Sequence, residues 1–184
     1  MQKICLLAFS LLVFLFSFSA SFAEVSSPTP TPKVNYELPY PGLLPDSPIY
    51  FLKIIRDKTV NFLISDPKKK AEFYLLQADK RLNAGIYIFN KGKVSISIST
   101  ISKAENYFEQ ALQKIKEAKG QGMETTEITN KLIDVTKKHQ EVLKSLEKKS
   151  PKNFKSNFNQ ELQRVDKFAE EAIALTLKEL KESK

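Results

Sequence analysis

The sequence EITNKLIDVTKKHQEVLKSL, residues 127–146, has the most regular pattern in the chain. Apolar residues and one histidine recur there at alternating intervals of four and three, at Ile128, Leu132, Val135, His139, Val142 and Leu146. This spacing puts the six side chains on one stripe of an α-helix, as in helices that pack side by side. The residues between them are mostly charged or polar and suit a surface in water. The stretch therefore predicts an amphipathic helix of a helical bundle.

The same periodicity occurs on both sides of this stretch. One stripe runs from Ala71 to Phe89 at intervals of three and four residues, and another runs from Phe158 to Thr176. Residues 94–98 alternate with a period of two and would also suit a strand, but no second strand is available to pair with them. We therefore expect an all-α fold, a single bundle of about five helices. The predicted helices span residues 48–65, 67–91, 94–119, 125–149 and 151–182.

Proline and glycine mark the ends of these helices. The pairs Asp66-Pro67 and Ser150-Pro151, and the triplet 46–48 (Asp-Ser-Pro), each place a capping side chain beside a proline, which predicts three helix starts. Gly92 separates the second and third helices, while 120–122 (Gly-Gln-Gly) separates the third from the fourth.

Residues 1–23 are predicted to be a signal peptide. Lys3 is their one charge, an apolar run follows it, and Ser21-Phe22-Ala23 has small residues at both positions that signal peptidase reads. An uncleaved signal anchor is the alternative, since about 20 apolar residues can span a bilayer. We expect a secreted or extracytoplasmic protein, membrane-anchored if the segment stays on. The lone cysteine, Cys5, leaves with the signal, so the mature chain would have no disulfide or thiolate site.

The remaining chain is predicted to form a linker and one domain. Residues 24–38 are a linker rich in Ser, Thr and Pro, of which residues 26–32 (SSPTPTP) are predicted to be an extended tether, and residues 39–184 are the helical bundle domain. In the second half of the proline-rich region, apolar side chains accompany the prolines. We expect Tyr40, Leu43, Leu44 and Tyr50 to form either a clasp over one end of the bundle or a groove for a partner.

The net charge of +8 and the pI near 9.4 allow attraction to polyanions. The lysines are spread over all polar faces, however, which is also typical of a soluble helical surface, and nucleic acid is not an expected partner. Lys68, Lys69 and Lys70 lie in the first turn of a predicted helix, where free amides and positive charge together would suit an anion or an acidic partner. The alternative is a solvated patch.

His139 is the one histidine, and no catalytic, cofactor-binding or metal-ligating set forms around it. A bundle metal site would pair it with Glu in a Glu-x-x-His motif, but that position is Thr136. No other carboxylate is evident on the apolar stripes. We therefore interpret His139 as a packed, hydrogen-bonded core residue, buried and neutral, with a pKa below the usual 6.5.

Two resemblances add to this interpretation. The positions of Gly92, Ala104, Phe108 and Ala111 are similar to the spacing of a single tetratricopeptide hairpin. The segment Pro41-Gly42-Leu43-Leu44-Pro45-Asp46-Ser47-Pro48-Ile49-Tyr50, followed by Asp66-Pro67 and KAEFYLLQADKRLNA (70–84), resembles a family of exported bacterial all-helical proteins classed as a domain of unknown function. This second resemblance implies an exported all-α domain and assigns no functional residue.

The sequence thus favours a non-catalytic binding or scaffold module of the cell envelope or extracellular space. Its partner would be a protein or an envelope polymer, and the sequence does not fix the oligomeric state. The alternatives are a polyanion-binding protein that uses basic helix faces and a membrane-anchored interaction protein. An enzyme is not expected, because no nucleophile motif or glycine-rich phosphate loop is present.

Overall fold

The computed structural model describes residues 34–182, with side chains as far as Lys178. The predicted signal peptide and most of the predicted linker lie outside the described residues. Within them the chain forms five α-helices and no strand, which confirms the all-α fold. The helices are α2 (Tyr50–Leu63), α3 (Pro67–Asn90), α4 (Val94–Gly120), α5 (Thr126–Lys149) and α6 (Lys155–Glu182), with a short 3₁₀ helix η1 (Lys152–Phe154) before the last.

The helix bounds lie close to the predicted ones, and the differences have local causes. Asp66 caps α3 as predicted, because its carboxylate accepts a hydrogen bond from the amide of Lys69 at 2.8 Å. The predicted cap at 46–48 is wrong, since α2 begins after Ile49 without a side-chain cap. Asp46 instead pairs with Lys91 and Lys93, at 3.1 and 2.8 Å. The last helix begins later than predicted because η1 follows Pro151.

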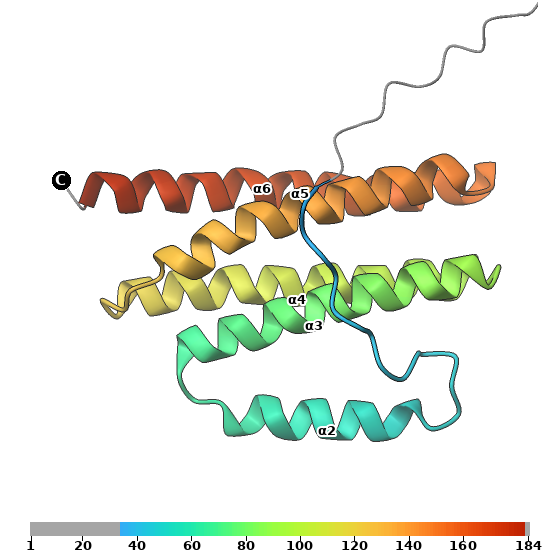
Figure 1. Ribbon diagram of the computed structural model, residues 1–184, viewed down its shortest axis with the longest axis horizontal. Helices are drawn as coiled ribbons and strands as arrows, with labels where there is room; N and C mark the ends of the chain where they lie inside the picture. Colours follow the sequence, from blue (N-terminus) through green and yellow to red (C-terminus); the bar gives the residue numbers. More distant parts are fainter. Residues whose placement is uncertain (1–33, 183–184) are drawn as a thin grey trace, which may run out of the picture. The chain divides into compact units, whose positions relative to one another are not determined.

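Helices α3 to α6 form the body of the bundle as two antiparallel hairpins (Figure 1). Helix α3 packs along α4, and α5 packs along α6, while α4 against α6 and α3 against α5 join the two hairpins. The predicted stripes line the common core. Its largest fully buried apolar side chains are Phe108, Phe158, Leu75, Leu82, Ile88, Ile101, Leu112, Ile115, Leu132 and Leu143.

Helices α3 and α4 approach each other closely at Gly85, which has no side chain. A Cβ atom at Gly85 would lie 2.4 Å from Cγ1 of Ile101, so only glycine allows this approach. Gly92 lies in the turn between the two helices with φ of +77°, in the left-handed region that favours glycine. The other three positions of the tetratricopeptide resemblance, Ala104, Phe108 and Ala111, all lie in α4, and that resemblance stays a prediction.

Residues 34–49, here called the strap, cross α5 and α3 before they reach α2 (Figure 1). The amide of Val34 donates to Glu141 of α5 at 2.8 Å, and Asn83 of α3 donates to the carbonyl of Pro39 at 2.9 Å. Tyr36 and Leu38 pack against the core. The strap is thus fixed to two helices by apolar and polar contacts.

Candidate functional site

Helix α2 presents its polar side to the bundle. Its two buried residues are Lys53 and Asp57, each 5% exposed. Polar atoms on the facing side of α3 are buried as well, in Gln77 and Arg81. Helices normally turn their apolar stripe inward, because burial of apolar surface is the main stabilising force in folding. The orientation of α2 is therefore the reverse of that in an ordinary bundle helix.

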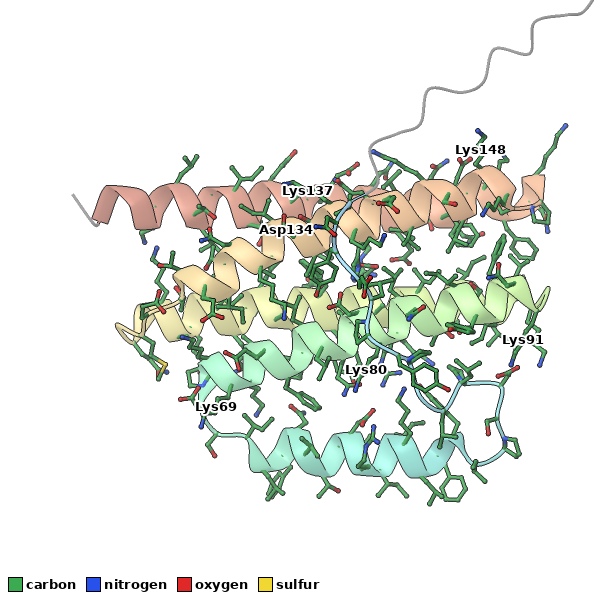
Figure 2. The ribbon with its side chains drawn as sticks, viewed as in Figure 1. Lys69, Lys80, Lys91, Asp134, Lys137 and Lys148 are labelled. Atoms are coloured by element: carbon green, nitrogen blue, oxygen red, sulfur yellow. The ribbon has the colours of Figure 1, made fainter. Side chains whose placement is uncertain are left out.

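The apolar side of α2 faces solvent. Phe62 is 84% exposed and Leu63 71%, and Phe51, Leu52 and Ile55 are each more than half exposed. Side chains project from α2 on the side away from α3 (Figure 2). None of the closely packed helix pairs in the described range includes α2. Contiguous exposed apolar surface of this kind is typical of an interaction site.

Polar contacts to the strap and to α3 hold α2 in this orientation. Lys53 Nζ donates to the carbonyl oxygens of Pro41 at 2.6 Å and Leu43 at 3.4 Å. Burial lowers the pKa of Lys53 to about 8, although the nearby Asp57 carboxylate opposes this shift. At the start of the helix, Arg81 Nη1 donates to the hydroxyl of Tyr50 at 2.8 Å.

Of the predicted clasp residues, Tyr40, Leu43 and Leu44 lie on the strap and Tyr50 is the first residue of α2. Tyr40 is 75% exposed and Leu43 is exposed, so the expectation that their apolar surface holds the strap down is wrong. The apolar contacts that hold the strap against the core come from Tyr36 and Leu38 instead. Tyr40 and Leu43 instead line a hollow of about 320 Å³, together with Pro41, Gly42, Leu52, Lys53, Arg56 and Lys80. Leu44 is half-buried, and a partner groove at these residues stays a prediction.

Lys68, Lys69 and Lys70 lie in the first turn of α3, as predicted. Two of the groups that would bind an anion there are already engaged, because Asp66 accepts from the amide of Lys69 and Lys68 Nζ lies 3.4 Å from Glu124. Figure 2 shows Lys69 at one end of α3 and Lys91 at the other. Anion binding by the three lysines stays a prediction.

A second feature is a buried charged network centred on His139. Its Nδ1 lies 3.0 Å and 3.2 Å from the two carboxylate oxygens of Glu105, and its Nε2 lies 3.2 Å from Asp79 Oδ1. The hydroxyl of Tyr36, on the strap, donates to Asp79 Oδ2 at 2.6 Å. His139 and Glu105 have no exposed surface, and Asp79 is 2% exposed. The network joins α3, α4, α5 and the strap.

The interpretation of His139 as packed and hydrogen-bonded is confirmed, but the predicted neutral state is wrong. Burial alone lowers the pKa of His139, whereas the charge of Glu105 and the hydrogen bonds with Asp79 and Glu105 raise it, and the balance lies at about 9. Burial and the Asp79 carboxylate likewise raise the pKa of Tyr36. At neutral pH the ring is therefore an imidazolium between two carboxylates.

The two carboxylates were missed in the sequence although a signal was present. Asp79 lies four residues after Leu75 and three before Leu82, and Glu105 has the same relation to Ile101 and Phe108. Both therefore occupy stripe positions. They lie on opposite nitrogens of the ring, so they do not converge on a common point, and among the described residues no group of His, Cys, Asp and Glu is placed to hold a metal.

No helix within residues 34–182 is long and apolar enough to span a bilayer. No curated protein and no solved structure matches the chain. The model of one family, described as a domain of unknown function (DUF5667), matches residues 42–153. This match begins in the strap, includes α2 to α5 and covers more than half of the chain. It includes residues 42–48 of the Pro-Gly-x-x-Pro-Asp-Ser-Pro element and both polar partners of His139, and the chain therefore belongs to the DUF5667 family.

Proposed function

We propose that the protein is an exported, non-catalytic binding module of the cell envelope or extracellular space, and that it meets its partner through the outward face of α2. The proposal rests on one observation: the apolar side of α2 lies in solvent while its polar side is buried. Phe62 and Leu63 at the end of the helix are the most exposed of these side chains.

The rest of the structure supports a passive role for the bundle body. Its one histidine is fully buried and paired on both ring nitrogens, so it joins helices and offers no free nitrogen to a substrate. The body thus acts as a support on which the strap and Lys53 fix the direction of α2. Export is supported by the apolar run and small residues within 1–23.

Retention on a cell-envelope fraction tests the proposal. Wild-type protein should be retained, whereas Phe62→Asp should pass through, because a carboxylate within the contact would have to be desolvated. Tyr87→Asp, at a half-exposed position of α3, is the matched control and should behave as wild type. Equal retention of Phe62→Asp and wild type would rule out α2 as the contact surface.

A further inference from the structure

We propose that the outward face of α2 binds an anionic phospholipid bilayer and lies flat in its headgroup region. The inference rests on the proposed function and names the partner of that same surface. It depends on the shape of the apolar face, on the charges at its borders and on the length of the helix.

The apolar face is continuous around one side of the helix. At 3.6 residues per turn, Phe51, Leu52, Ile55, Phe62 and Leu63 fall within an arc of about 120°. The one polar residue in this arc is Thr59, and its hydroxyl donates to the carbonyl of Ile55 at 3.0 Å. Because that hydroxyl is satisfied within the helix, the face can enter an apolar medium without an unpaired donor.

Basic side chains border the apolar arc on both sides. Arg56 follows one edge and Lys58 the other, and both are exposed. The one acidic residue of the helix, Asp57, is buried on the opposite side, where it pairs with Arg56 at 2.7 Å. An apolar face flanked by Lys and Arg is typical of helices that lie in a membrane interface, with aliphatic stems in the acyl boundary and charges among the headgroups.

The same charges disfavour a second copy of the chain as the occupant. Two α2 helices packed face to face would bring Arg56 and Lys58 of one copy against the basic borders of the other. The chain also has a net charge of +8, so two copies repel each other at long range. An anionic surface instead attracts both the basic borders of α2 and the positively charged chain as a whole, since each Lys or Arg near it is attracted.

The length of α2 fits a helix that lies on a bilayer. Its 14 residues extend about 21 Å at 1.5 Å per residue, which is shorter than the hydrocarbon core of about 30 Å. The exposed aromatic residues Phe51 and Phe62 lie near its two ends, so both ends of the helix can be anchored.

A tryptophan placed on the face gives a direct test, because the chain contains no tryptophan. Phe62→Trp reports on α2 itself, and Phe51→Trp is a second reporter should the first variant fold poorly. Tyr87→Trp on α3 is the control. Each protein, in the form in which the producing cell releases it, is mixed with vesicles of phosphatidylglycerol and phosphatidylcholine, and with vesicles of phosphatidylcholine alone.

The expected result is a blue shift of the Phe62→Trp emission with the anionic vesicles, a much smaller one with neutral vesicles, and none for Tyr87→Trp. Arg56→Gln and Lys58→Gln should each weaken vesicle binding about fivefold. Four results would each overturn the inference: no shift with anionic vesicles, an equal shift with neutral vesicles, an equal shift for Tyr87→Trp, or a shift that depends on protein concentration without vesicles. The last would indicate self-association.

The two proposals can fail separately. Envelope retention that is lost on Phe62→Asp but persists after the lipids are extracted would keep α2 as the contact surface and point to a protein or wall polymer. In that case the bilayer inference is wrong and the binding-module proposal stands. Equal retention of both proteins on the intact envelope would reject the binding-module proposal and the bilayer inference together.

Discussion

At the scale of single residues, His139 determines how α3, α4 and α5 meet. The ring lies between Asp79 and Glu105, with one carboxyl group on each ring nitrogen, and the hydroxyl of Tyr36 donates to Asp79 Oδ2 at 2.6 Å. A buried charge is tolerated only when it is paired and hydrogen-bonded. Each of these four side chains is therefore needed for the others to be buried.

The stability of the protein should depend on pH through this network. Because the pKa of His139 is raised from 6.5 to about 9, its contribution is fully present below about pH 6.5 and is lost as the pH rises through 9. The loss should be on the order of 3 kcal/mol. The ring resonances of the single histidine report its pKa directly. Urea unfolding of the wild type and of His139→Leu between pH 6 and 9.5 measures the loss as the difference between the two proteins, because Lys53, with its pKa lowered to about 8, adds an opposite dependence to both.

A ring that titrates below 6.5, with a free energy of unfolding that is flat or rising up to pH 9, would contradict the charged network. That result would support the interpretation from the sequence alone, in which His139 is a neutral core residue.

His139→Leu should destabilise the protein by about 3–5 kcal/mol, because it leaves two buried carboxylates without a cation. Denaturant unfolding at pH 7 measures the loss. Adding Glu105→Gln in the same chain should recover part of the stability, since one of the two unpaired charges is then removed. A His139→Leu protein as stable as wild type would show that the carboxylates are neutral or hydrated.

At the scale of the elements, the α3–α4 hairpin depends on the glycine at its closest approach. Gly85→Ala should destabilise the protein by about 1–3 kcal/mol despite the better helix propensity of alanine, because the added methyl collides with Ile101. Gly120→Ala, at the end of α4, is the matched control and should be neutral or stabilising, since no atom lies within 4 Å of its added Cβ. Thermal unfolding of both variants provides the comparison, and an unchanged midpoint for Gly85→Ala would mean that the helices lie further apart.

The helices could be predicted from the sequence because each depends on local information. Stripe spacing sets where α3 to α6 are amphipathic, and Asp66-Pro67, Gly92 and Gly122 mark their ends. The sequence could not predict that α2 packs against the bundle through its polar side, because an amphipathic pattern does not specify which side of a helix is buried. That choice depends on the bonds of Lys53 to the strap carbonyls, which only the folded chain brings together.

At the scale of the whole described chain, stability should be unevenly distributed. The body has a continuous apolar core, whereas α2 is held by a few polar contacts. Local opening requires least energy where few apolar contacts are lost. Amides of α2 should therefore exchange with deuterium much faster than amides in the middle of α3 and α4, in a native-state experiment read by mass spectrometry or NMR. Equal protection would show that α2 is part of the core.

The bond between Val34 and Glu141 also sets an order of events during synthesis. The two residues are 107 positions apart, so the strap can be fixed only after α5 has been made. The α3–α4 hairpin involves neighbouring segments that precede α5 and can form earlier, since short loops close at less entropic cost. Helix α2 precedes all of them and has no finished support when it first emerges. Its apolar side is thus uncovered earliest and longest, and a surface close to the point of emergence can bind it before the bundle is complete.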